Sequence, residues 1–130
     1  MDVILDTCAL LSLVGLTDRH LSGEALGMIR HAAKVHVSAC SMFEIAIKHK
    51  RQGLCLGIFD NAAQLWETAL REYRLNELPV SHDVFYQSVL LPDHHADPFD
   101  RIIIAHARKA AIPVITFDRT FLMYQVAVVN

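Results

Sequence analysis

The sequence lacks the features that mark membrane and exported proteins. No apolar run approaches the roughly 20 residues that a membrane-spanning helix needs. The longest purely apolar stretches are short, as at Ile102–Ala105 and Val126–Val129. The N-terminus has no basic region followed by a hydrophobic run, so we expect no signal peptide and no membrane association.

Cysteine and glycine motifs are also scarce. The three cysteines, Cys8, Cys40 and Cys55, are an odd number without C-x-x-C spacing. They predict free thiols in a reducing cytoplasm, packed in the core beside their apolar neighbours. The eight histidines show no zinc-binding spacing, which argues against a structural zinc site. A Gly-rich phosphate loop is absent, which argues against a nucleotide-driven switch.

No charge of one sign dominates, since 12 basic residues oppose 14 acidic ones for a net charge of −2. The chain is therefore not a general polyanion binder. One basic run, residues 48–51, can serve as a local nucleic-acid patch or simply complement a helix dipole. The high hydrophobic content, 53%, predicts elements buried on more than one side or an apolar surface covered by a partner.

What the sequence does contain is a regular alternation of short apolar runs with helical patterns. We expect strands at residues 3–5, 35–37, near 78–80, 114–117 and 126–129. We expect helices at residues 7–15, 22–34, 39–51, 61–74, 81–91 and 98–110. This order predicts one α/β domain over residues 1–130, with a parallel sheet of four to five short strands flanked by helices on both faces.

Four acidic side chains are placed to meet at one edge of this sheet. Asp6 and Asp118 directly follow predicted strands, and Glu44 and Asp100 lie early in predicted helices. Functional groups in a parallel sheet collect outside the carboxyl ends of its strands. Four such carboxylates repel one another unless a cation or protons neutralise them. A Mg²⁺ or Mn²⁺ ion prefers these oxygen ligands and supports phosphodiester hydrolysis by water.

Each acid also has a local explanation that remains open from sequence alone. Asp6 and Asp118 can be helix N-caps, and Asp100 can merely compensate a helix dipole. The spacing Ser41-x-x-Glu44 fits a capping box, unless the helix begins earlier, at Ser38. Asp97, directly before a proline at the first helical position, is assigned to capping rather than to the site.

Other polar residues near the acids are weaker candidates. Arg101 and Arg119 each follow an acid and can contact a phosphate backbone or form surface ion pairs. Lys48 can bind substrate or pair with the acid one turn earlier. Thr7 and Ser41 can hydrogen-bond a metal-bound water or serve helix starts. The adjacent histidines of the polar loop, His94 and His95, are interpreted as ordinary loop residues.

The motifs together resemble a known family. Residues 5–11 (LDTCALL), 41–48 (SMFEIAIK), 97–107 (DPFDRIIIAHA) and 116–118 (TFD) are similar in order and separation to the PIN domain. The resemblance is strongest to VapC-type toxins of bacterial toxin–antitoxin pairs and spans nearly the whole chain. His106 is a departure, because related proteins often carry another polar residue there.

The resemblance implies an endoribonuclease dependent on Mg²⁺ or Mn²⁺, with Asp6, Glu44, Asp100 and Asp118 as its catalytic and metal-holding acids. It also implies a homodimer inhibited by a small antitoxin protein. A different class of function is a catalytically silent PIN-fold module that binds RNA or protein, against which the four intact acids argue. A phosphatase of the haloacid dehalogenase class is disfavoured, because Cys8 stands where its second aspartate belongs.

Overall fold

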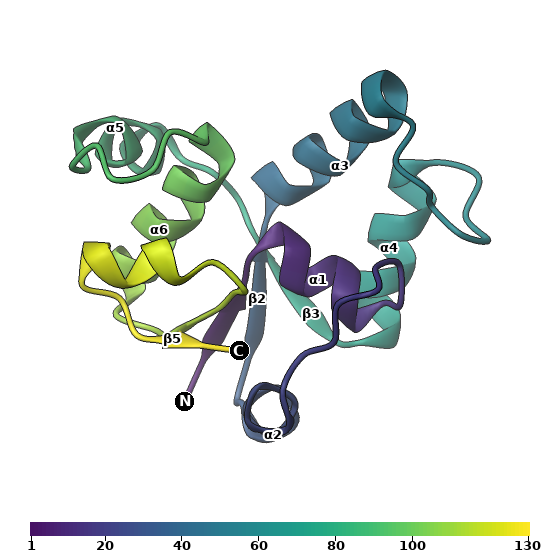
Figure 1. Ribbon diagram of the computed structural model, residues 1–130, viewed down its shortest axis with the longest axis horizontal. Helices are drawn as coiled ribbons and strands as arrows, with labels where there is room; N and C mark the ends of the chain where they lie inside the picture. The colour runs from purple at the N-terminus through teal and green to yellow at the C-terminus, as the bar shows by residue number, and fades with distance from the viewer.

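The computed structural model describes residues 1–130 and contains a single five-stranded sheet in which every pairing is parallel (Figure 1). The strands are β1 (Val3–Leu5), β2 (Val35–Ser38), β3 (Leu75–Leu78), β4 (Val114–Ile115) and β5 (Val128–Val129). Their order across the sheet is β3-β2-β1-β4-β5. In the central strand, Leu5 pairs with Val37 on one side and Ile115 on the other. The predicted architecture is confirmed.

Helices cover both faces of the sheet, with α5 and α6 on one side and α1 and α4 on the other (Figure 1). The helices are α1 (Thr7–Leu13), α2 (Gly23–His31), α3 (Ala39–Gln52), α4 (Ala62–Glu72), α5 (His82–Leu90), α6 (Pro98–Ala110) and the 3₁₀ helix η1 (Arg119–Tyr124). Val3 and Leu5 pack into one apolar cluster, whereas Ile4 packs into the other. Because successive strand side chains point to opposite faces, a strand buried on both faces must be continuously apolar.

Two elements differ from the sequence expectation. The third strand occupies Leu75–Leu78 instead of residues 78–80, because Pro79 has no N–H to donate to a strand ladder. The strand is an edge strand with Asn76 and Glu77 exposed, so its sequence carries little apolar signal. The 3₁₀ helix at residues 119–124 is not among the predicted helices, although Asp118 was considered as a possible N-cap, which is the role it has here.

The cysteines also differ in part from expectation. All three are free thiols, as predicted. Cys40 is buried, but Cys8 and Cys55 are exposed, so the prediction of core packing is wrong for these two residues. Apolar neighbours in sequence do not bury a side chain that points away from the core.

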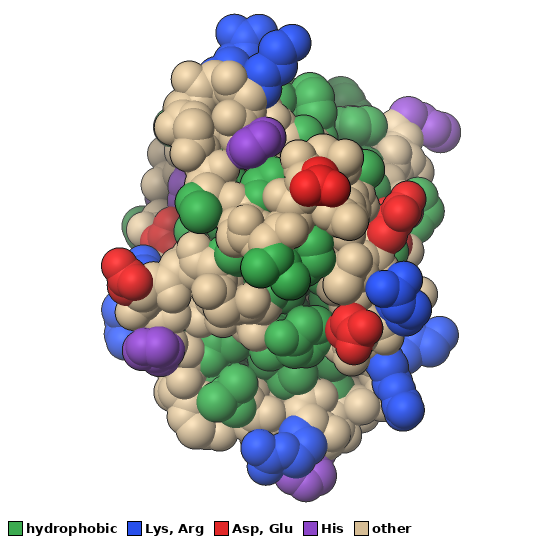
Figure 2. All heavy atoms as spheres, turned by 90° about the vertical axis from the view of Figure 1, so that its right-hand side faces the viewer, with side chains coloured by type: hydrophobic (Ala, Val, Ile, Leu, Met, Phe, Trp, Pro, Cys, Tyr) green, Lys and Arg blue, Asp and Glu red, His purple; other side chains and the backbone are tan.

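One face of the molecule carries mixed charge. Figure 2 views the side on which α3 and α4 lie, where acidic, basic and hydrophobic side chains are interspersed and neither sign of charge forms a continuous field. No helix is both long and apolar enough to span a bilayer.

Candidate active site

A groove of about 380 Å³ opens at the carboxyl edge of the sheet, where β1 and β4 end. All four predicted acids line it, together with neighbouring polar and basic side chains. The lining residues are Asp6, Thr7, Cys8, Arg19, Glu44, Lys48, Asp97, Asp100, Phe117, Asp118 and Arg119. The carboxyl ends of β1 and β4, which Asp6 and Asp118 follow, therefore border a concave surface.

Asp6 is both a helix cap and a member of this groove. One of its oxygens, Oδ1, accepts a hydrogen bond from the backbone N–H of Ala9 at 2.8 Å. Its Oδ2 accepts a hydrogen bond from the hydroxyl of Thr116, which directly follows the neighbouring strand β4. Burial, together with the nearby charges of Glu44 and Asp118, raises the pKa of Asp6 to about 6, although these two hydrogen bonds act to lower it. Asp6 is thus both the N-cap of α1 and a residue of the groove.

Glu44 is not part of a capping box. Helix α3 begins at Ala39, and its N-cap is Ser38, whose hydroxyl accepts from the N–H of Cys40 at 3.2 Å. The alternative helix start is confirmed, and the capping-box interpretation is wrong. Glu44 is therefore free to lie in the second turn, where its carboxylate is buried in the groove wall.

The Glu44 carboxylate is only half satisfied. Its Oε2 accepts from Lys48 Nζ at 2.5 Å, whereas its Oε1 is buried and has no hydrogen-bond partner. A buried charged oxygen without a partner is strongly unfavourable. A cation bound in the groove would supply the missing partner, so the donor set fits a hard divalent metal ion.

Asp100 lies in the first turn of α6, which Asp97 caps by accepting the N–H of Phe99 at 2.8 Å. The assignment of Asp97 to capping is confirmed. Burial raises the pKa of Asp100 to about 7, with further contributions from the charges of Asp97 and Asp6. A carboxylate in such surroundings is a group that a bound cation would stabilise in its ionised form.

Asp118 is the most exposed of the four acids. Its Oδ1 accepts the N–H of Thr120 at 2.9 Å, and so caps the 3₁₀ helix. Burial acts to raise its pKa, but the hydrogen bonds from Thr120 and His95 outweigh burial and lower it. Asp118 therefore stays ionised more readily than Asp6 and Asp100.

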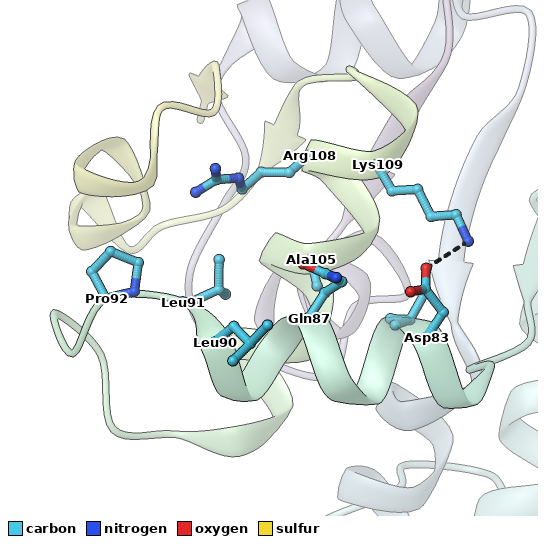
Figure 3. Close-up of a pocket in the computed structure, with 9 residues that line it drawn as sticks. Asp83, Gln87, Leu90, Leu91, Pro92, Ala105, Arg108 and Lys109 are labelled. Carbon is cyan, nitrogen blue, oxygen red and sulfur yellow. Dashed lines mark hydrogen bonds and ion pairs between the residues drawn. The ribbon is translucent and has the colours of Figure 1, made fainter.

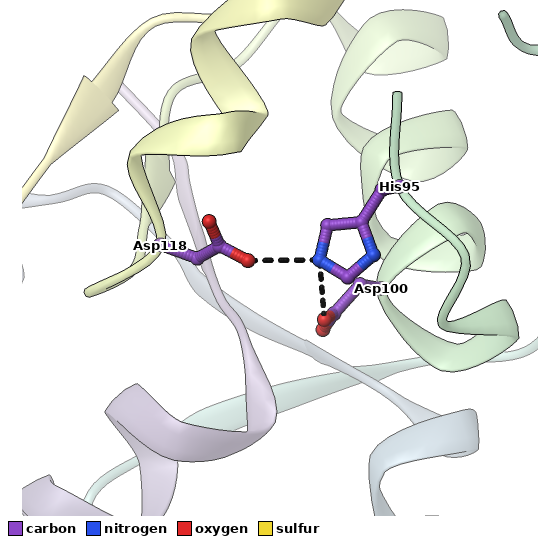
Figure 4. A group of neighbouring side chains, drawn as sticks. All are labelled: His95, Asp100 and Asp118. Carbon is purple, nitrogen blue, oxygen red and sulfur yellow. Dashed lines mark hydrogen bonds and ion pairs between the residues drawn. The ribbon is translucent and has the colours of Figure 1, made fainter. Parts of the chain in front are cut away.

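His95 belongs to the site, which corrects its interpretation as an ordinary loop residue. Its Nε2 lies 2.8 Å from Asp118 Oδ2 and 3.1 Å from Asp100 Oδ2 (Figure 4). The signal available in the sequence was its position two residues before the cap of α6. That signal is weak, because it does not say which way the loop turns.

The family model described as "PIN domain" matches residues 3–127. The chain belongs to the PIN domain family. No curated protein matches it by sequence.

Solved structures share the fold of this PIN domain at low sequence identity. A toxin–antitoxin complex from Klebsiella pneumoniae is similar with a TM-score of 0.66 and 21% identity, over 98% of this chain and 96% of that chain. VapBC2 from Rickettsia felis, bound to a promoter DNA fragment, gives 0.68 and 14%, over 100% and 98%. Mycobacterium tuberculosis VapC20, a toxin that cleaves the sarcin–ricin loop, gives 0.61 and 20%, over 93% of each chain.

The basic candidates of this PIN domain separate into two groups. Lys48 and Arg119 line the groove, as does Arg19, which sequence reasoning missed. The Arg19 guanidinium lies 4.3 Å from the centre of the Phe117 ring, so a cation–π contact holds it at the rim. Only the fold reveals this, since the two residues are far apart in sequence.

Arg101 is withdrawn from the substrate-binding candidates. It is buried, and its guanidinium donates to backbone carbonyls of the last turn of α5, at Ser88 and Val89, and of the α5–α6 connection, at Leu91, Pro92 and His95. Its donors are occupied by the protein and do not face the groove. Thr7 lines the groove, whereas Ser41 does not; both are buried, and Thr7 donates its hydroxyl to Ser41 at 2.8 Å.

A second hollow of about 380 Å³ lies between α5 and α6, away from the acids (Figure 3). Its only acidic residue, Asp83, accepts from Lys109 Nζ at 3.3 Å. With a single carboxylate that is already paired, this hollow has no cluster of metal-ligand oxygens. The acidic groove is the better candidate for the active site.

Proposed function

We propose that this PIN domain, which we take to span residues 1–130, is an endoribonuclease that hydrolyses RNA phosphodiester bonds with the help of Mg²⁺ or Mn²⁺. The buried, unpartnered Oε1 of Glu44 carries the proposal, because it needs a cation that the protein's own side chains do not supply. Asp6, Glu44, Asp100 and Asp118 are the proposed catalytic and metal-holding acids.

The ion, when bound, polarises the scissile phosphate and lowers the pKa of water. The protein's residues orient the groups around it. Asp6 is fixed by Ala9 and Thr116, and Glu44 is fixed by Lys48. Lys48, Arg19 and Arg119 place positive charge around an acidic groove, where they can hold the phosphates of an RNA strand. No nucleophilic side chain is required.

Cleavage of RNA by the purified chain in Mn²⁺ or Mg²⁺, abolished by a chelator, is the test. Asp6→Asn and Asp100→Asn are the informative variants, since asparagine keeps the helix cap of Asp6 but removes the charge. We expect each to lose at least about 100-fold in rate, because metal-held charge supplies several kcal/mol of transition-state stabilisation. Asp93→Asn, at a fully exposed side chain, is the matched control.

Two results would contradict the nuclease. One is an absence of metal-dependent cleavage in the wild-type chain. The other is unchanged activity in both Asn variants. A chain that binds RNA or protein but shows no metal binding in calorimetry would instead be a silent PIN-fold module.

We further propose that the chain is the toxin of a toxin–antitoxin pair, acting in the cytoplasm as a homodimer. Similar structures described as toxin–antitoxin complexes support this role. Exposed apolar side chains on α5, at Phe85, Tyr86, Val89 and Leu90, are suited to cover by a protein partner. Expression of the chain should arrest growth, and co-expression of a small protein encoded beside it should restore growth.

A further inference from the structure

One nitrogen atom occupies the space between two of the four acids. His95 Nε2 lies within hydrogen-bond distance of Asp118 Oδ2 and of Asp100 Oδ2 at the same time (Figure 4). Asp100 comes from α6 and Asp118 from the start of η1, so the imidazole connects two elements across the end of the groove. This position is where a second cation shared by these carboxylates would have to bind.

The other ring nitrogen determines what Nε2 does. His95 Nδ1 accepts a hydrogen bond from the backbone N–H of Asp97 at 3.1 Å, so Nδ1 carries no proton. A neutral imidazole then holds its proton on Nε2. Nε2 therefore donates its hydrogen bond to Asp118 Oδ2 and lies 3.1 Å from Asp100 Oδ2, and its lone pair is not available to a metal ion.

The ring is held in this orientation from several sides. The His95 carbonyl accepts from the Arg101 guanidinium at 3.0 Å. The edge of the ring packs against Phe121, with 5.9 Å between ring centres, and only 15% of the side chain is exposed. Arg101 is itself bonded to four further carbonyls, so the loop that carries His95 is tied to the core. The donor is thus built into the fold.

We propose that His95 takes the place of a second metal ion, so that this chain is a one-cation nuclease. The inference rests on the proposed function and deepens it. This narrows the metal-holding set of the proposed function from four acids to three: Asp6, Glu44 and Asp100 would hold the single ion, and Asp118 would join the site through the N–H of His95. A second ion bound by Asp100 and Asp118 at about 2.1 Å would face this N–H directly, which opposes its binding. His95 is a positioning residue.

Counting Mn²⁺ ions on the full-length chain tests the proposal, by calorimetry and by electron paramagnetic resonance. We expect about one Mn²⁺ per wild-type chain and no spin-coupled pair. His95→Ala removes the donor and should admit a second ion about 3.5–4 Å from the first, giving a spin-coupled signal. His95→Gln places an amide N–H near the position of Nε2 and should restore binding of about one ion.

His94→Ala is the matched control, because His94 is exposed and its side chain contacts Tyr124 rather than the acids. It should bind about one ion, as the wild type does. Two ions on the wild type, or one ion on a folded His95→Ala variant, would overturn the proposal and leave the nuclease intact. No ion on the wild type would contradict the proposed function itself. If His95→Ala does not fold, the wild-type and His95→Gln counts still decide.

Discussion

At the scale of single residues, Glu44 lowers the stability of the metal-free fold at the position where we propose that it holds a metal ion. Its buried Oε1 lacks a partner, while its Oε2 is paired with Lys48. Lys48 is partly exposed, so it can return to water if the pair is lost. The unpartnered carboxylate oxygen therefore lowers the stability of the metal-free fold.

Glu44→Gln should make the metal-free protein more stable. The substitution removes a buried charge, and we expect the free energy of unfolding to rise by about 1 kcal/mol in the presence of a chelator. The same variant should lose the stabilisation that Mn²⁺ gives the wild type. Urea unfolding with and without Mn²⁺ measures both effects. Glu67→Gln, on the exposed surface of α4, is the control and should change neither.

The pKa values of Asp6 and Asp100 predict how metal binding depends on pH. They are raised to about 6 and about 7, so part of each group is protonated in the metal-free protein near neutral pH. Metal binding must displace those protons. We therefore expect affinity for Mn²⁺ to rise with pH between 6 and 7 and to level off above this range.

Calorimetry in two buffers of different ionisation enthalpy gives the number of protons released. We expect about one proton near pH 6.5 and close to none at pH 8.5. An affinity that does not change between pH 6 and 7 would mean that these two carboxylates do not hold the ion.

At the scale of elements, Arg101 fixes the connection between α5 and α6. Its guanidinium donates to several carbonyls of this connection, which positions both His95 and the start of α6. Lysine has only one nitrogen and cannot reproduce a planar fork of donors. The connection therefore depends on the identity of the residue as well as on its charge.

Arg101→Lys should destabilise the fold by about 2–3 kcal/mol, because buried carbonyls lose their donors. Thermal unfolding would detect it. Arg108→Lys is a suitable control, since that guanidinium makes one carbonyl contact of 3.4 Å, to Tyr124. Equal stability of the Arg101→Lys variant and the wild type would show that these hydrogen bonds contribute little.

At the scale of the whole molecule, stability varies with pH through groups whose pKa values are shifted in opposite directions. Asp6 and Asp100 have raised pKa values, so their contribution to metal-free stability is full below their unfolded value and is lost as pH rises through about 6 to 7. His106, on α6, is buried beside Ser38 at the end of β2, with 2.9 Å between Nε2 and Oγ. Burial, with Lys109 and His36 nearby, lowers its pKa to about 4.

Folding therefore favours the neutral form of His106. Its contribution is full above the unfolded pKa of 6.5 and is lost as pH falls toward about 4. His106→Gln keeps a polar partner for Ser38 but does not titrate, so it should lack roughly 2 kcal/mol of the acid-induced destabilisation seen in the wild type. Urea unfolding of both proteins between pH 4 and 7 checks this. Parallel pH profiles would contradict it.

The sequence alone determined most of the elements and the edge of the sheet at which Asp6 and Asp118 lie. Continuous apolar strands such as Val3–Leu5 require burial on both faces, and this local property predicts a parallel sheet. Asp6 and Asp118 follow strand ends, so their placement at one edge needs no knowledge of the strand order. Where the local signal was weak, as at the polar edge strand Leu75–Leu78, the prediction was displaced.

Only the tertiary structure decided what individual polar side chains do. Arg101 and His95 lie near each other in sequence, yet the fold turns the first into the interior and the second toward the acids. Glu44 was freed from a capping role because the N-cap of α3 is Ser38, three residues before Ser41, and only packing left its Oε1 without a partner. Hydrogen-bond partners distant in sequence are set by how elements pack, which local patterns do not encode.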